Sequence, residues 1–63
     1  MNESFLRPKD AAKKAGISVS HLYVLIANNE FPTPVRLSPN IVVFLESEID
    51  NWIVQRTEHG RKP

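Results

Sequence analysis

The segment that decides the fold runs from Gly16 to Pro32 and reads GISVSHLYVLIANNEFP. The glycine is followed by Ser18, a residue type that caps helix N-termini, and then by apolar residues at positions 19, 22, 23 and 26. Apolar residues at i, i+3, i+4 and i+7 are typical of one face of an amphipathic helix. Two asparagines and a Phe-Pro pair end the pattern, because proline disfavours helix in the residue before it. The segment predicts a short helix over residues 18–29.

A second short helix is predicted over residues 8–15, immediately before this segment. Pro8 suits a first helical turn, where its missing N–H costs nothing, and three alanines form a narrow apolar face. Gly16 suits the left-handed position that ends a helix, and Asp10 is expected to pair with Lys14 one turn later. Two short helices joined by a turn that contains glycine are the signature of a helix-turn-helix.

The sequence changes to β-prone residues after Pro32. Residues 35–37 and 41–44 predict two strands, with Ser38-Pro39-Asn40 as the turn between them. Because two strands are not stable alone in water, the hairpin must pack on the helices.

A third helix is predicted to follow the hairpin. Ser47 is its expected N-cap, apolar residues at 49, 52 and 53 form its inner face, and Gly60 is expected to end it. Residues 59–63 are expected to fray.

The order of elements predicts a fold that is mainly α with a small β-hairpin. It is a winged helix-turn-helix in the order α-α-β-β-α, built as a single domain over residues 1–63 with a core of about 5–58. The residues expected to form the core are Phe5, Leu6, Ala12, Ile17, Leu22, Ile26, Phe31, Leu37, Phe44, Ile49, Trp52 and Ile53.

Composition argues against several classes of function. The 63 residues include no cysteine, and the two histidines lack ligand spacing, so no metal site is expected. No catalytic carboxylate pair, nucleophile–base set or glycine-rich phosphate loop is recognisable, so we expect no enzyme, no cofactor and no small-molecule substrate. No apolar stretch approaches the roughly 20 residues of a membrane span and no secretory signal is recognisable, so a cytoplasmic protein is expected.

Charge is a weak indicator of nucleic-acid binding in this chain. The net charge is +1 and the isoelectric point is about 8.2, whereas DNA-binding domains commonly exceed about 9. The distribution is more informative, because lysines gather in the N-terminal third and the acids Glu46, Glu48 and Asp50 gather at the predicted start of the third helix. The helix dipole favours acids there.

The outward face of the predicted 18–29 helix holds candidates for reading DNA bases. A helix-turn-helix places its second helix in the major groove, and residues on the face opposite the apolar stripe would meet base edges. Serine can bond to either base type, asparagine can pair with adenine, and an apolar side chain can contact the thymine methyl. Tyr23 is expected at the edge of the core, with its hydroxyl free to reach a phosphate. The base-reading candidates are Ser20, His21, Val24 and Asn28.

Other residues are candidates for phosphate contacts, which fix register and supply non-specific affinity. Lys9 and Lys13 lie on the first predicted helix, and Arg36 lies on the hairpin. Ser18 lies at the N-terminus of the second helix, where free N–H groups attract anions. For any single charge, plain solvation of the surface is the alternative interpretation.

The run from Leu6 to Arg56 resembles the AlpA-like prophage regulators. These are small winged-helix proteins akin to phage excisionases and to the DNA-binding half of MerR-type regulators. The matching stretches are GISVSHLYVLIANNEFPTPVRLSPN and FLESEIDNWIVQR. The resemblance implies a protein that binds double-stranded DNA and either activates transcription of an integrase gene or assists excision of an integrated element. It also implies an integrase (a tyrosine recombinase) and further copies of the chain on DNA as partners.

The chain departs from the pattern of that family in its charges. Relatives commonly carry arginine or lysine at the positions of Val19, Val24 and Ala27, and a basic residue at the hairpin tip, where this chain has Asn40. A neutral recognition helix implies weak binding by one copy and a shallow salt dependence. Several copies or a larger partner would then supply useful affinity, since multivalency raises avidity by roughly 10²–10⁴.

A protein-interaction adaptor remains the alternative class. In that case the fold would dock on a recombinase or a polymerase through apolar residues expected to be exposed, namely Val24, Leu25 and Val54. Duplex binding at several salt concentrations separates the two classes.

Overall fold

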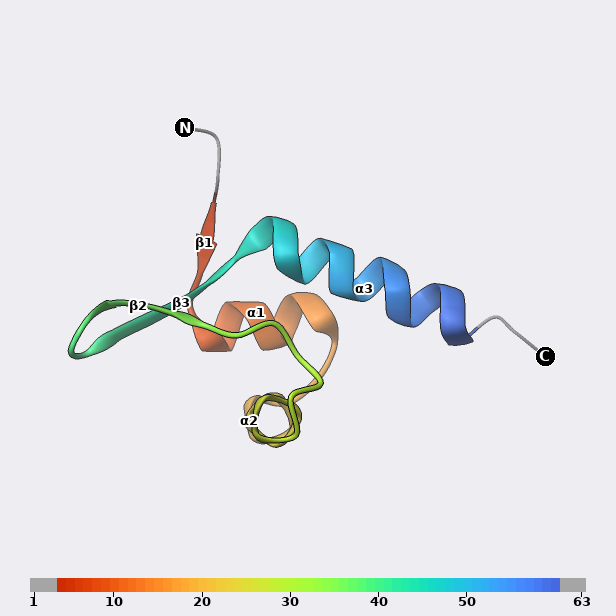
Figure 1. Ribbon diagram of the computed structural model, residues 1–63, viewed down its shortest axis with the longest axis horizontal. Coiled ribbons are helices and arrows are strands. Elements are labelled where there is room, and N and C mark those ends of the chain that lie inside the picture. The colour runs from red at the N-terminus through yellow and green to blue at the C-terminus, as the bar shows by residue number, and fades with distance from the viewer. Residues whose placement is uncertain (1–3, 61–63) are drawn as a thin grey trace.

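The computed structural model describes residues 4–60, which form three helices and a small antiparallel sheet (Figure 1). The elements are β1 (Phe5–Leu6), α1 (Pro8–Ala15), α2 (Val19–Ala27), β2 (Val35–Ser38), β3 (Ile41–Leu45) and α3 (Glu46–Gly60). The predicted fold class is confirmed: the chain is mainly helical, with a hairpin between the second and third helices. None of the helices in residues 4–60 is long and apolar enough to cross a membrane.

The turn between α1 and α2 has the geometry that its residues predicted. Gly16 adopts a left-handed conformation with φ of 75°, and the N–H groups of Gly16 and Ile17 donate to the carbonyls of Lys13 and Ala12 at 3.1 and 3.0 Å. These two bonds satisfy carbonyls that the end of α1 would otherwise leave unpaired. Ser18 then caps α2, since its hydroxyl oxygen accepts from the backbone N–H of His21 at 3.1 Å.

Replacing Gly16 with alanine is expected to destabilise the chain by about 1–2 kcal/mol, because a Cβ atom disfavours the left-handed conformation. A methyl group there would have no heavy atom within 4 Å, so the cost is conformational rather than steric. Urea denaturation followed by circular dichroism measures it. Gly60→Ala, in the last turn of α3, is the matched control, and it is expected to leave stability unchanged or raise it by up to about 1 kcal/mol.

The C-terminal end of α2 is a second left-handed cap, formed by an asparagine. Asn29 has φ of 59°, its N–H donates to Ile26, and the N–H of Glu30 donates to Leu25 at 2.8 Å. This pair of bonds is a Schellman motif. It ends the regular helix at Ala27, two residues before the predicted boundary.

The sheet contains a strand that the sequence analysis missed. The strand order is β1-β3-β2, and β1 pairs antiparallel with β3, with Phe5 opposite Leu45 and Leu6 opposite Phe44. The backbone N–H of Glu46 extends this ladder to the carbonyl of Ser4 at 2.9 Å. A two-residue strand is too short to show a period-two pattern, so only its pairing defines it. The hairpin is therefore anchored by the N-terminal segment as well as by the helices.

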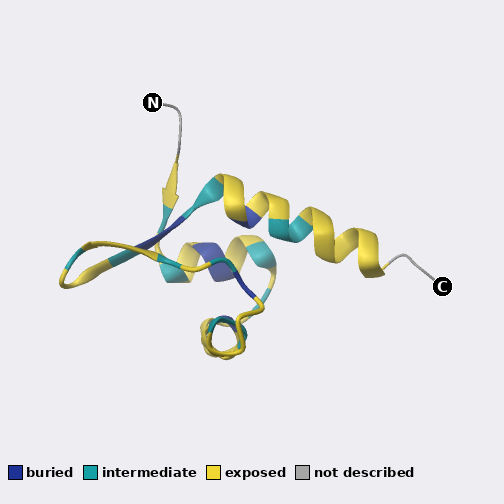
Figure 2. Cartoon of the chain, in the orientation of Figure 1, coloured by how far each residue is buried: buried dark blue, intermediate teal, exposed yellow. Residues whose placement is uncertain are grey.

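The core lies where α1, α2, α3 and β3 meet (Figure 2). Its buried residues are Ala11, Ala12, Leu22, Phe31, Val43, Phe44 and Ile49. Five of these were predicted, and five further predicted core residues are half-buried against them: Leu6, Ile17, Ile26, Trp52 and Ile53. Most of the predicted core is confirmed.

Three apolar side chains were wrongly placed in or at the edge of the core. Phe5 is 45% exposed, because adjacent residues of a strand face opposite sides and Leu6 takes the inner side. Leu37 is 54% exposed, since the register shifts between Arg36 and Ser38 and such a bulge re-aims the extra side chain. Tyr23 is 51% exposed, and Leu22 is the only buried residue of α2, so the buried strip of this helix is narrower than its apolar pattern suggested.

Two ion pairs join α1 to the first turns of α3. The ammonium of Lys14 lies 2.7 Å from the Glu46 carboxylate and 2.8 Å from that of Asp50. The predicted partner Asp10 was therefore wrong, because α3 packs on α1 and brings two other carboxylates to this lysine. The predicted N-cap at Ser47 was also wrong: α3 begins at Glu46, directly after β3. The helix continues through His59 and Gly60, where fraying was expected, and residues 61–63 lie outside the described residues.

The pKa of Lys14 is raised above its usual 10.5 by hydrogen bonds to Asp50 and Glu46. Since the folded state holds this proton more tightly than the unfolded state, the ion pairs contribute fully below pH 10.5, and their contribution is lost as the pH rises above it. We expect the stability of the Lys14→Gln variant to fall less than that of the wild type across this alkaline range. Lys13→Gln removes the same charge from the same helix and is expected to keep the wild-type profile. Urea denaturation at pH 9 to about 11.5 measures both.

Candidate nucleic-acid interface

The outward face of α2 is set by the one residue of this helix that is buried. Ser20 and Val24 lie two positions on either side of Leu22, which turns both to the opposite side of the helix. Both are exposed, and the Val24 side chain is 52% exposed. Ala27 lies on the same side and is also exposed. The centre of this face is therefore small and neutral.

The other two base-reading candidates lie on a flank of α2. His21 and Asn28 are exposed, and His21 borders a hollow of about 280 Å³ that is also lined by Leu25 and Trp52. This flank thus faces α3, and Tyr23 lies on the flank away from it by helical geometry. The four base-reading candidates therefore cover the outward face of α2 and also its flank toward α3. Leu25 is half-buried and packs against the core, which corrects its expected exposure in the adaptor interpretation.

Candidate phosphate contacts are exposed on α1, at the start of α2 and on the hairpin. Lys9 and Lys13 are exposed on α1, and Arg36 is exposed on β2. None of the three has an ion-pair partner within residues 4–60. Ser18 is exposed at the start of α2 and uses its hydroxyl oxygen as the helix cap, which leaves its hydroxyl hydrogen available. Asn40 is exposed in the hairpin turn.

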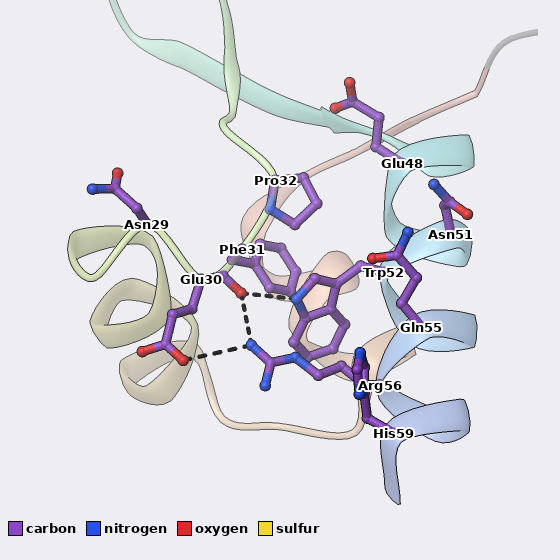
Figure 3. Close-up of a pocket in the computed structure, with 10 residues that line it drawn as sticks. All are labelled: Asn29, Glu30, Phe31, Pro32, Glu48, Asn51, Trp52, Gln55, Arg56 and His59. Carbon is purple, nitrogen blue, oxygen red and sulfur yellow. Dashed lines mark hydrogen bonds and ion pairs between the residues drawn. The ribbon is translucent and has the colours of Figure 1, made fainter.

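The end of α2 is tied to α3 by contacts that the sequence analysis missed (Figure 3). The indole N–H of Trp52 donates to the Glu30 carbonyl at 2.8 Å, and Arg56 donates to the same carbonyl at 3.2 Å. The Arg56 guanidinium also lies 3.6 Å from the Glu30 carboxylate and 5.1 Å from the centre of the Trp52 ring. We call these three residues the Glu30 clamp. The spacing of Trp52 and Arg56 predicted that both lie on one face of α3. No sequence pattern near either residue predicted their contacts with Glu30.

The clamp adds hydrogen bonds to the packing of Leu22, Leu25 and Ile26 that holds α2 on the core. Phe31 packs its ring 4.8 Å from Trp52 and 5.6 Å from Phe44. The loop after α2 is therefore held by both hydrogen bonds and aromatic contacts. This arrangement fixes the position of the loop after α2 relative to α3.

These features define a small helix-turn-helix protein with a β-hairpin between its second and third helices. The family model described as "Prophage CP4-57 regulatory protein (AlpA)" matches residues 4–57, and the chain belongs to this family of regulatory proteins, which is not an enzyme family. The chain is similar to the uncharacterized protein ORF88 of Enterobacteria phage P4, with 40% identity over 60 residues that cover 95% of this chain and 67% of that protein. No solved structure matches the chain. The predicted family is confirmed.

Proposed function

We propose that the protein is a sequence-specific regulator that binds double-stranded DNA of a prophage or other integrated element in the bacterial cytoplasm. The observation that carries this proposal is the exposed face of α2, together with Lys9, Lys13 and Arg36, which are exposed and have no ion-pair partner within residues 4–60. An exposed helix face can enter a major groove, and exposed cations without ion-pair partners can bind the phosphates that border it. Family membership adds the link to phage regulation.

Base contacts are assigned to the band of polar and small side chains on α2. Ser20 and Asn28 can donate to or accept from base edges, and Val24 can contact a thymine methyl group. His21, on the flank toward α3, can bond to a base or a phosphate. Tyr23 is exposed on the other flank, and its hydroxyl is assigned to a phosphate contact.

Phosphate contacts are assigned to α1, the start of α2 and the hairpin. Lys9 and Lys13 supply positive charge from α1, and Ser18 supplies a hydroxyl. Arg36 and Asn40, on the hairpin, contact the phosphate backbone of the DNA. Because the centre of the α2 face is neutral, one copy would bind weakly. Further copies of the chain or an integrase on the same DNA would raise the affinity. Activation of integrase transcription and assistance in excision both use this interface.

Replacing Lys9, Lys13 or Arg36 with alanine is expected to lower affinity for all duplexes alike. A lost phosphate contact reduces the salt slope by about 0.9, which corresponds to about eightfold in affinity near 0.1 M salt. Fluorescence anisotropy measures this with duplexes from the attachment region and the integrase promoter of the element that encodes the chain. Lys14→Gln removes the same charge at a position already paired with Glu46 and Asp50, and it is expected to bind as the wild type does.

Two results would contradict the DNA-binding proposal. One is the absence of binding to either duplex at about 0.1 M salt together with retention of the element's recombinase, which would support the adaptor class instead. The other is a loss confined to one sequence in the lysine variants, because phosphate contacts carry no sequence information.

A further inference from the structure

A groove of about 720 Å³ lies between the loop that follows α2 and one side of α3 (Figure 3). Asn29 to Pro32 border it on the loop, and Glu48, Asn51 and Gln55 border it on α3, with Trp52 between the two sides. We call it the Trp52 groove. None of the residues that line it is a proposed DNA contact, although Trp52 and Arg56 also line the hollow beside His21.

The groove is built on a rigid base. The Glu30 clamp joins the loop to α3 through three contacts with Trp52 and Arg56, and the ring of Phe31 packs on Trp52. A preformed site costs less ordering entropy on binding than a site that must be assembled.

The α3 side of the groove carries hydrogen-bonding groups that are unused within the described chain. Glu48, Asn51 and Gln55 make no side-chain hydrogen bond or ion pair with residues 4–60. Carboxamides can both donate to and accept from a peptide backbone. The exposed edges of Pro32 and Trp52 add an apolar surface next to them.

The charge of the groove lining determines which charge a bound segment should carry. The groove is lined by three residues with a formal charge at pH 7, namely Glu30, Glu48 and Arg56, and the Glu30 carboxylate is paired with Arg56. Glu48 has no ion-pair partner within residues 4–60, so the formal charge of the lining, with His59 counted as neutral, is negative. This is the opposite of the basic surface on α1 and β2, and it disfavours DNA as the occupant.

We propose that the Trp52 groove binds an extended, positively charged segment of another protein. An arginine or lysine of that segment pairs with Glu48, an adjacent apolar side chain packs on Pro32 and Trp52, and the segment's backbone bonds to Asn51 and Gln55. This inference goes beyond DNA binding, because it gives the chain a second surface that can be occupied while α2 lies in a groove of DNA.

Trp52 is the single tryptophan of the chain, so its fluorescence reports directly on the groove. The probe is a capped hexapeptide of alternating leucine and arginine, and the matched control is the peptide of alternating leucine and glutamate. We expect a saturable change in emission with the basic peptide, weakened by salt, and none with the acidic one. Glu48→Gln is expected to weaken binding about fivefold, the upper range for an ion pair in contact with solvent.

Glu58→Gln is the control variant, because it removes the same charge from α3 outside the residues that line the groove. It is expected to bind the basic peptide as the wild type does. The proposal is overturned if the basic peptide causes no change at millimolar concentration, if both peptides bind equally, or if the two variants lose affinity equally. It is also overturned if duplex DNA changes the emission and displaces the peptide, which would assign the groove to DNA. Because the peptide titrations need no DNA, a failure of the DNA-binding proposal is detected separately.

Discussion

Replacing Phe44 with alanine is expected to lower the free energy of unfolding by about 3–5 kcal/mol, the usual cost of truncating a buried phenylalanine. Phe44 is 1% exposed in the central strand, and its ring meets that of Phe31 edge to face at 5.6 Å. Phe31 in turn packs on Trp52. A domain of this length has a total stability of about 3–9 kcal/mol, so the variant is expected to lose at least about a third of it.

Urea denaturation followed by far-ultraviolet circular dichroism measures this loss, and Trp52 fluorescence provides a second probe. Leu37→Ala is the informative control, because Leu37 lies in the adjacent strand but is exposed. It is expected to change stability by less than about 1 kcal/mol. A larger loss for Leu37→Ala than for Phe44→Ala would contradict the assigned register of the hairpin.

Replacing Leu22 with alanine is expected to cost about 2–5 kcal/mol and to abolish DNA binding with it. Leu22 is the only buried residue of α2 within the described chain, and a nine-residue helix has little stability without tertiary contacts. Loss of this anchor removes the helix that we propose to enter the major groove. Thermal unfolding and anisotropy with the duplexes described above measure the two effects.

Val24→Ala separates the roles of folding and binding on the same helix. Val24 lies on the opposite side from Leu22 and is exposed, so the variant is expected to keep its stability within about 0.5 kcal/mol. Its affinity for thymine-containing sites is expected to fall, because the contact with the methyl group is lost. If Val24→Ala instead lowered stability as much as Leu22→Ala, the assigned outward face of α2 would be wrong.

The interface itself was only partly predictable. The exposure of Lys9, Lys13 and Arg36 was expected from their positions in the sequence pattern. The Glu30 clamp and the Trp52 groove were not expected, since the clamp joins residues 22 and 26 positions apart and the groove lies between the same two segments. They also depend on the angle between α3 and the loop after α2, which no local pattern encodes.

The sequence by itself determined the helices, the turn between them and the hairpin. Gly16, Ser18 and Asn29 act on backbone groups within three or four residues of themselves, and such short-range effects can be recognised from neighbouring residues alone. The periodicity of α3 likewise placed Ile49 and Trp52 on its inner face.

Only the tertiary structure decided which side chains are covered and which charges meet. The pairing of β1 with β3, the outward position of Tyr23 and the choice of Glu46 and Asp50 as partners of Lys14 all depend on elements far apart in the chain. The physical reason is that burial and ion pairing are properties of the surfaces that pack together. A helix carries an apolar face in its own sequence, but the neighbour that packs on it sets how much of that face leaves water.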